Sequence, residues 1–187
     1  MQAIVAVSEN WGIGKDNDLL FHISADLKRF RELTAGHTVV MGRKTLESLP
    51  GGKGLPKRRN IVLTANPDFT AENAEVVDNP AQLIFAAGAD AFVIGGATVY
   101  RQLLNLCDRI YVTKVFAAPE ADAFFPDLDA DPNWEIAEES EIMEENGVRF
   151  QYVDYVPRQE EEEDFLTMPA PPEAFAPVDG FSPFSGF

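Results

Sequence analysis

The chain has little cysteine, few basic residues and no long apolar run. Cys107 is the single cysteine among 187 residues, so an internal disulfide and a cysteine-based metal site are both excluded. We expect Cys107 to be a small core residue, and we expect no bound metal. Lysine and arginine number 15 against 31 aspartates and glutamates, which gives a net charge of -16. This balance argues against a surface that binds nucleic acid, because such a surface needs a basic face.

No part of the sequence is typical of a membrane segment or of a signal peptide. Residues 81–100 form the most apolar stretch, but Gly88, Asp90, Gly95 and Gly96 interrupt it. This pattern fits a helix, a turn and a strand better than one membrane span. Residues 1–9 lack the basic start and the long apolar run of a secretory signal. We therefore expect a cytoplasmic protein that does not bind membranes.

What the sequence does contain is the hydrophobic pattern of an α/β domain. Runs of β-branched and apolar residues predict strands at residues 3–7, 38–41, 60–63, 75–77, 91–94 and 109–116, and helical patterns predict helices at residues 24–33, 44–48, 80–87 and 98–104. Strands that alternate with helices indicate a largely parallel sheet covered on both faces. Two further strands, residues 134–140 and 148–156, are expected to form a closing antiparallel hairpin across Asn146-Gly147. The predicted fold is therefore α/β, with a central eight-stranded, mostly parallel mixed sheet and four flanking helices.

Residues 159–187 differ in composition from the rest of the chain. They combine a run of glutamates with several prolines and isolated phenylalanines, without helical or strand periodicity. Such a segment buries too little apolar area to offset the entropy lost on ordering. We expect one domain over residues 1–158, followed by a disordered, acidic Pro/Phe-containing tail that acts as a solubilising extension. A linear docking motif for a partner that the sequence does not identify, or a lid that folds back, are the alternatives.

A carboxylate interrupts the apolar stripe of the predicted helix at residues 24–33. Ser24 is expected to be its N-cap, and the stripe consists of Ile23, Leu27, Phe30 and Leu33. At about 100° per residue, Asp26 lies among these positions and should point inward. A carboxylate in an apolar setting needs a partner, a raised pKa or a polar ligand. The alternative is that Asp26 lies in a solvated first turn and complements the helix dipole.

Two turns between a strand and a helix are suited to phosphate groups. The run Gly42-Arg43-Lys44-Thr45 opens a helix with free backbone N–H groups and two cations, although the glycine spacing around it excludes a P-loop. The run Ile94-Gly95-Gly96-Ala97 also opens a helix, without the GxGxxG fingerprint, and lets the backbone approach a ligand. Thr64 provides a third polar strand end. Together these turns favour a ligand with several phosphates, such as a dinucleotide, over ordinary connections.

A glycine-containing segment, residues 11–20, connects the first strand to the Asp26 helix. A connection of this length in a compact domain is often a lid over a ligand, and the alternative is a passive loop. We expect Trp11 to pack on the surface of the protein, and the alternative is that it supplies an aromatic cover from the lid. We expect His22 to be a partly exposed loop residue and not the proton partner of Asp26.

In this order and at this spacing, the motifs resemble those of bacterial-type dihydrofolate reductases. The resemblance covers residues 1–158 and rests on Gly12-Ile13-Gly14, Ala25-Asp26-Leu27 with Phe30, residues 40–45 with Glu47-Ser48, Leu55-Pro56 with Arg58-Arg59-Asn60, Ile94-Gly95-Gly96 with Tyr100, and Tyr111-Val112-Thr113. The resemblance implies an NADPH-dependent oxidoreductase that reduces 7,8-dihydrofolate to 5,6,7,8-tetrahydrofolate, by hydride transfer to pterin C6 with protonation at N5. It further implies a role in one-carbon metabolism, inhibition by antifolates, and a monomer.

The resemblance also assigns residues to the reaction. Asp26 resembles the carboxylate that binds the pterin, Thr113 the threonine that bridges to it, and Leu19 and Phe21 belong to the catalytic surroundings. Many family members carry proline and tryptophan where this chain has Leu20-Phe21. Phe21 cannot donate the indole N–H that helps to hold a water near the carboxylate, so this chain departs from those relatives in the water-mediated part of the proton path.

The ligand-binding positions follow from the same resemblance. The substrate positions are Ile4, Val5, Asp26, Leu27, Phe30, Leu49, Leu55, Arg58, Ile94 and Thr113, with Arg58 suited to the glutamate α-carboxylate of the substrate. The cofactor positions are Ala6, Ile13, Gly14, Gly42, Arg43, Lys44, Thr45, Leu63, Thr64, Ile94, Gly95, Gly96, Ala97, Thr98, Val99 and Tyr100.

Two other functions are compatible with parts of this pattern. One is another pteridine or pyrimidine reductase on the same fold, which would have no need of Arg58 because its substrate lacks a glutamate tail. The other is a non-catalytic folate-binding or scaffold protein. The presence of Asp26 and of both phosphate-ready turns argues against lost catalysis.

Overall fold

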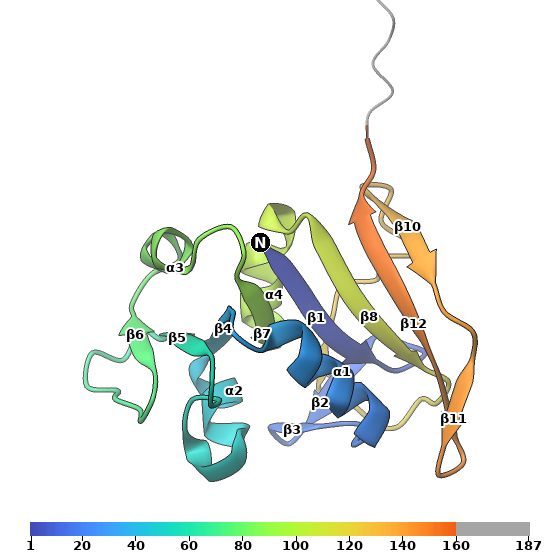
Figure 1. Cartoon of the computed structure of the whole chain (residues 1–187), viewed down its shortest axis with the longest axis horizontal. Coiled ribbons are helices and arrows are strands. Elements are labelled where there is room, and N and C mark those ends of the chain that lie inside the picture. Colours follow the sequence, from blue (N-terminus) through green and yellow to red (C-terminus); the bar gives the residue numbers. More distant parts are fainter. Residues whose placement is uncertain (160–187) are drawn as a thin grey trace, which may run out of the picture.

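A twisted mixed sheet forms the centre of the protein, and the computed structural model describes residues 1–159 (Figure 1). Along the sheet the strands follow the order β10-β12-β8-β1-β7-β4-β5-β6, with β11 paired to β12 outside this path. Their bounds are β1 (Gln2–Val7), β4 (Thr38–Gly42), β5 (Arg59–Leu63), β6 (Glu75–Val77), β7 (Phe92–Gly95), β8 (Arg109–Val115), β10 (Trp134–Glu139), β11 (Met143–Glu145) and β12 (Val148–Pro157). The strands from β8 to β6 are parallel, whereas β12 and β10 are antiparallel. The α/β fold class is thus confirmed.

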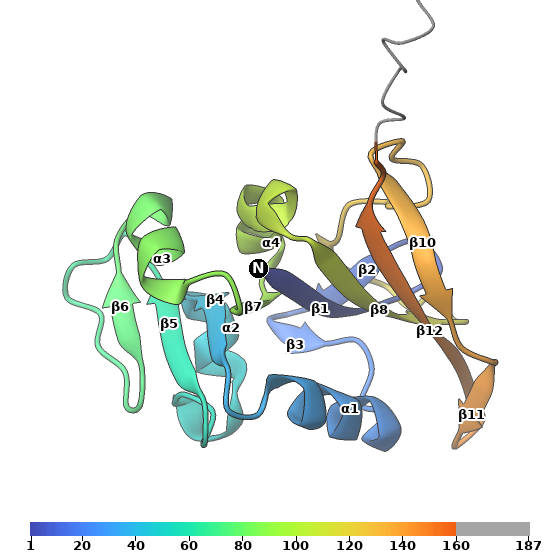
Figure 2. The same cartoon turned by 45° about the horizontal axis from the view of Figure 1, so that its top comes forward.

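Helices cover both faces of this sheet (Figure 2). The helices are α1 (Ser24–Thr34), α2 (Arg43–Ser48), α3 (Pro80–Ala87) and α4 (Ala97–Leu103), with short 3-10 turns at Pro50–Gly52 and Leu104–Leu106. Neighbouring residues of β4 show why both faces are apolar. Val39 and Met41 pack with Leu46 of α2, while Val40 packs on the other face with α3 and α4 side chains. Side chains alternate along a strand, so a strand buried on both faces reads as a continuous apolar run.

The C-terminal strands differ from the predicted hairpin in one respect. The Asn146-Gly147 turn joins β11 to β12, and β10 pairs farther along the same edge of β12. Both turn residues have positive φ, 50° at Asn146 and 78° at Gly147, as a tight two-residue hairpin turn requires. Since β12 has 10 residues, its edge is long enough for two short partners. The predicted antiparallel pairing of residues 134–140 with 148–156 is therefore confirmed, but their direct connection was wrong because β11 lies between them in the chain.

The segment at residues 11–20 is a β-hairpin within a second, three-stranded sheet. It contains β2 (Gly12–Lys15) and β3 (Asp18–Leu19), and β2 also pairs with β9 (Ala123–Phe124). Trp11 is buried and stacks on Phe125, with ring centroids 6.3 Å apart. The expectation of a surface position for Trp11 was wrong, because a segment far along the chain covers it.

Several smaller expectations can be compared with the described residues. Cys107 is buried, and burial raises the pKa of its thiol to about 12. Within residues 1–159, every helix is too short or too polar to cross a membrane. The predicted tail lies outside the described residues, except for Gln159.

The sheet opens between β1 and β7 toward their carboxyl ends. The pairing of these strands ends at Ala3 with Val93, whereas β1 stays paired with β8 as far as Val7 and Lys114. Just beyond the last β1–β7 pair, the Tyr100 hydroxyl donates a 2.6 Å hydrogen bond to the Ile4 carbonyl. In parallel α/β sheets, ligands bind outside the carboxyl ends of strands where the chain direction along the sheet reverses. The opening marks such a place here.

Candidate active site

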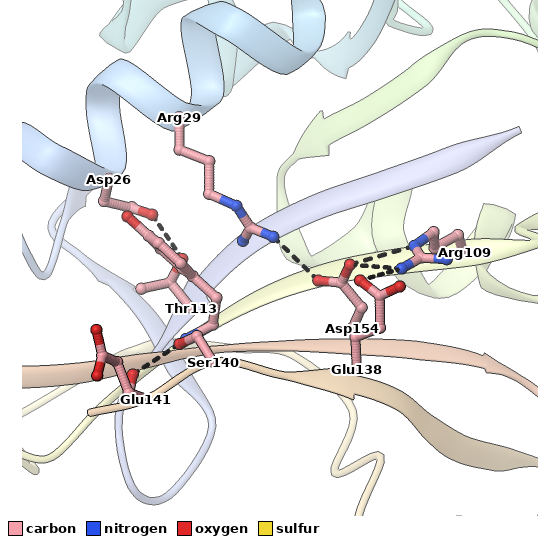
Figure 3. A network of polar contacts seen from close by, with 9 residues as sticks. Asp26, Arg29, Arg109, Thr113, Glu138, Ser140, Glu141 and Asp154 are labelled. Carbon is pink, nitrogen blue, oxygen red and sulfur yellow. Dashed lines mark hydrogen bonds and ion pairs between the residues drawn. The ribbon is translucent and has the colours of Figure 1, made fainter. Parts of the chain in front are cut away.

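Asp26 on α1 and Thr113 on β8 form the polar centre of the site (Figure 3). The Thr113 hydroxyl donates a hydrogen bond of 2.5 Å to Oδ1 of Asp26. Asp26 is half-buried and Thr113 is buried, so the carboxylate faces the sheet, as the helical wheel predicts. Burial raises the pKa of Asp26 above its usual range, while the Thr113 hydrogen bond and the Arg29 cation oppose the rise.

The first turn of α1 is held by a residue that local sequence patterns did not identify. Ile23, and not Ser24, occupies the N-cap position, and its side chain provides no cap. Instead, the Glu145 carboxylate of β11 accepts hydrogen bonds from the backbone N–H of Ser24 at 2.6 Å and of Ala25 at 3.1 Å. A carboxylate at a helix N-terminus satisfies free N–H groups and complements the dipole. The helix that carries Asp26 is thereby fixed to the β11–β12 hairpin.

Half-buried apolar side chains of α1 and of other segments pack on one core cluster, and we call this set the rim. They are Phe30, Leu49, Leu55 and Ile94, and all pack against one core cluster that contains Ile4, Met41 and Phe92. Leu27 is 39% exposed, so its expected place in the core-facing stripe was wrong. Such a rim suits a flat aromatic ligand, which would cover side chains that the protein leaves partly open.

Arg58 closes one end of this rim. Its Nε donates to the Thr34 hydroxyl at 2.9 Å and its Nη1 to the Pro56 carbonyl at 3.2 Å. Burial, and then the neighbouring Arg31 cation, lower the pKa of the Arg58 guanidinium. Within residues 1–159 no ion pair involves Arg58, whereas the adjacent Arg59 pairs with Glu75 at 2.8 Å. Arg58 therefore presents a charge without a carboxylate from the described part of the chain.

The two phosphate-ready turns meet at the carboxyl ends of β4 and β7. A Cβ atom on Gly95 would lie 3.0 Å from the Thr45 hydroxyl, and one on Gly96 would lie 3.4 Å from it. A Cβ on Gly42 would lie 3.2 Å from a Val99 methyl group. Larger residues at these positions would push the two turns apart, so the glycines let the turns pack closely side by side. The described residues thus fit a dinucleotide across both turns.

The cationic and polar residues beside these turns differ in their exposure and in their partners. Leu63 is paired with Gly42 across the β4–β5 ladder. Thr64, which follows Leu63, therefore lies beside the turn that begins at Gly42. Arg43 forms an i, i+4 ion pair with Glu47 at 2.9 Å. Lys44 is exposed. Tyr100, expected to border the ligand, is buried against Phe125 with its hydroxyl at the strand opening, and burial raises the pKa of its phenol.

The turn of the β2–β3 hairpin is held by two other segments of the chain. The Asp16 N–H donates to the Asp122 carboxylate at 2.9 Å, and Lys15 pairs with Glu120 at 2.9 Å. The Asn17 side chain donates to the Lys44 carbonyl of α2 at 3.2 Å. Glu120 and Asp122 gave no signal in the sequence, because more than a hundred residues separate them from the hairpin. The segment therefore reaches the phosphate-ready turn, as a lid would.

Leu19, Phe21 and His22, which precede Asp26 in the sequence, differ from one another in exposure and contacts. Leu19 is 56% exposed at the end of β3. Phe21 packs against a small cluster of Ile23, Val115 and Phe150. His22 is exposed, as expected, and lies 3.8 Å from the Asp18 carboxylate.

Comparison with known proteins identifies the family. The sequence model of dihydrofolate reductase matches residues 1–157. The chain is 39% identical over 156 residues to a dihydrofolate reductase of Bacillus subtilis (strain 168), covering 81% of this chain and 91% of that protein. The chain belongs to the dihydrofolate reductase family. A dihydrofolate reductase of Neisseria gonorrhoeae is 41% identical over 156 residues, covering 82% and 95% of the two chains.

The dihydrofolate reductase fold is also found by structure comparison. A dihydrofolate reductase from Enterococcus faecalis complexed with NADP(H) and RAB-propyl matches with a TM-score of 0.75 at 36% identity, covering 84% of this chain and 96% of that chain. The family resemblance read from the sequence is confirmed. The roles of individual residues in the dihydrofolate reductase site stay predictions.

Proposed function

We propose that this chain reduces 7,8-dihydrofolate to 5,6,7,8-tetrahydrofolate with NADPH, in support of one-carbon metabolism. The observation that carries the proposal is the half-buried Asp26 carboxylate, bonded to Thr113. The apolar rim and Arg58 support a folate, and the meeting of the two glycine turns supports a dinucleotide. Membership of the dihydrofolate reductase family supports both ligands.

Asp26 and Thr113 bind and orient the pterin in this account. The Asp26 carboxylate accepts hydrogen bonds from the pterin 2-amino group and the N3 region, and Thr113 fixes the carboxylate on its other side. A carboxylate with few competing waters interacts more strongly with a pterin that acquires positive charge. Asp26 thus favours protonation of the pterin, and an ordered water carries the proton to N5. Phe21 offers no hydrogen-bond donor that would help to hold this water.

The rest of the substrate occupies the rim and its charged end. Leu27, Phe30, Leu49 and Leu55 cover the aminobenzoyl ring, which gains from burial. The Arg58 guanidinium pairs with the glutamate α-carboxylate, and its fork geometry suits two parallel hydrogen bonds. A pteridine or pyrimidine reductase would leave this end of the site without a partner.

The residues that hold NADPH come from the carboxyl ends of three strands and the lid. Gly42, Arg43, Lys44, Thr45, Leu63 and Thr64 face its phosphates and adenosine side, Gly95, Gly96, Ala97, Thr98 and Val99 its pyrophosphate, and Ala6, Ile13, Gly14, Ile94 and Tyr100 its nicotinamide side. NADPH supplies the hydride for pterin C6 when bound. Leu19 and the anchored hairpin exclude water from this region. Because one chain provides every one of these residues, we expect a catalytically complete monomer.

Measurement of NADPH oxidation tests the proposal. We expect turnover with 7,8-dihydrofolate, competitive inhibition by a 2,4-diaminopyrimidine antifolate, and much lower kcat/KM with a dihydropterin that lacks the aminobenzoyl-glutamate. Equal kcat/KM for both substrates would support the pteridine reductase alternative. Folate binding without turnover would support the scaffold alternative.

A further inference from the structure

Arg29 lies one turn after Asp26 on α1 but pairs with a different carboxylate. Its Nη2 is 3.0 Å from Oδ1 of Asp154 on β12 (Figure 3). Asp154 is 5% exposed, and its Oδ2 accepts hydrogen bonds from Arg109 at 2.8 Å and 3.2 Å. Arg109 also pairs with the exposed Glu138 at 3.1 Å. One buried aspartate therefore holds two arginines, and one of them comes from the helix of the pterin carboxylate.

Aromatic rings fix the Arg29 guanidinium in the same place. Its Cζ lies 4.0 Å from the centroid of the Tyr152 ring and 5.5 Å from that of Tyr111. A guanidinium that stacks on an aromatic face in a partly desolvated site is held in orientation as well as in position. Its Nη1 is buried and has no hydrogen-bond partner among residues 1–159. The charge of Arg29 is thus only partly satisfied by Asp154.

The Arg29 side chain lies next to Asp26 on α1 (Figure 3), and its positive charge acts on the Asp26 carboxylate. The titratable and charged groups around the pair are Tyr111 on β8, Tyr152 and Asp154 on β12, Glu145 on β11 and Glu32 on α1. These groups are acidic or neutral, and the other cation of the network is Arg109 on β8, which binds Oδ2 of Asp154 and lies over the Tyr111 ring. Arg29 opposes the rise in the pKa of Asp26 that burial causes.

We infer that Arg29 is a positioning residue for the reaction, because Asp154 and Tyr152 keep its charge near Asp26 without letting the two pair. This inference rests on the proposed role of Asp26 in binding the pterin. A direct Asp26–Arg29 pair, which spacing on a helix permits, would occupy the carboxylate that the pterin needs. Without any cation, the half-buried carboxylate would lose its charge at a higher pH. Because Asp154 holds Arg29, the cation stays close to Asp26 but leaves the Asp26 carboxylate free to bind the pterin.

The pH dependence of hydride transfer in single turnover tests this inference. Removing the positive charge of Arg29 makes Asp26 keep its proton to a higher pH. For Arg29→Met we therefore expect the pH at which the rate of hydride transfer falls on the alkaline side to rise by about 0.5 to 1 unit. Arg29→Lys, which keeps the charge, should remain closer to the parent. Asp154→Asn removes a negative charge and releases Arg29 toward Asp26, so its alkaline fall should move down. Glu138→Gln, at the far end of the network, should leave the profile unchanged.

Opposite shifts for Arg29→Met and Asp154→Asn would support the inference, since general loosening of the fold has no reason to produce opposite signs. Arg29→Gln provides a second neutral variant if Arg29→Met folds poorly. An Arg29 variant without charge whose profile coincides with that of the parent overturns the inference. Failure of the proposed function is distinguished by Asp26→Asn: an unchanged profile in that variant refutes the role of Asp26 itself. If Asp26 has its proposed role, the Arg29→Met shift must disappear in the Asp26→Asn background.

Discussion

The Thr113 hydroxyl reaches across from β8 to donate a 2.5 Å hydrogen bond to the Asp26 carboxylate on α1. The bond joins a helix to β8, the strand that stays paired with β1 beyond the point where β7 separates from it. It also replaces part of the hydration that the half-buried carboxylate has lost, which is why it lowers the pKa that burial raises.

Thr113→Val removes the hydroxyl while keeping a side chain of similar shape. We expect dihydrofolate affinity to fall about tenfold, which corresponds to the loss of one hydrogen bond to a charged group. The pKa of Asp26 should rise, since the Thr113 bond lowers it. Fluorescence titration and the pH profile of turnover measure both effects. Thr113→Ser should retain most of the affinity, and similar losses for valine and serine would contradict the assigned bond.

Asp26→Asn should stabilise the protein at neutral pH. The folded-state pKa of Asp26 is raised by burial, so the folded protein binds this proton more tightly than the unfolded chain. The free energy of unfolding then falls as pH rises from the ordinary aspartate pKa, about 4, through the raised value. The amide has no such dependence. Urea unfolding at acidic and neutral pH measures the difference, and lower stability of the Asp26→Asn variant at neutral pH would contradict the buried placement.

Arg58→Leu should separate binding of the two ligands. Loss of a charge-assisted, two-bond contact with the glutamate carboxylate is expected to weaken dihydrofolate binding by about 10- to 100-fold. NADPH affinity should stay unchanged, because Arg58 lies at the α1 end of the rim. Arg59→Leu is the matched control, since Arg59 pairs with Glu75. Equal losses of both ligands, or equal effects of the two variants, would refute the assignment.

Gly95→Ala should damage the cofactor site. The added Cβ would lie 3.0 Å from the Thr45 hydroxyl at a residue with φ of 144°, so a cost of about 1–3 kcal/mol in stability is expected. NADPH affinity should fall at least about tenfold, as the two turns are pushed apart. Gly88→Ala is a control, because Gly88 also has positive φ, 75°, but no atom within 4 Å of the added Cβ. Unchanged NADPH affinity in the Gly95→Ala variant would argue against the proposed pyrophosphate turn.

Much of the fold could be predicted because its elements carry strong local patterns. The helix of Asp26 has a clear apolar periodicity, and the strand at Thr38–Gly42 is a continuous apolar run that indicates burial on both faces. The paired glycines at positions 95 and 96 indicated a close approach to the backbone. In the structure the approaching group is Thr45 of the other turn, and the approach to a ligand stays a prediction. Here local chemistry and tertiary packing agree.

The features that the sequence did not predict depend on partners far along the chain. The short β2 and β3 strands contain glycine and aspartate, which have low strand propensity, and they form because β9 pairs with β2. Glu145 caps α1 across 121 residues, and Asp154 holds Arg29 across 125 residues. Nothing in the neighbouring sequence of Arg29 indicates a buried aspartate on the strand Val148–Pro157. Such pairings follow from the register of the assembled sheet.

The rate of hydride transfer by Asp26→Asn, measured from NADPH absorbance in single turnover across pH, tests the central claim most directly. We expect a fall of about 100-fold or more at neutral pH, because the amide cannot stabilise positive charge on the pterin. Acidic solution should recover part of the rate, since the substrate is then protonated without help from the carboxylate. The same rate and the same pH profile as the parent protein would contradict the role of Asp26.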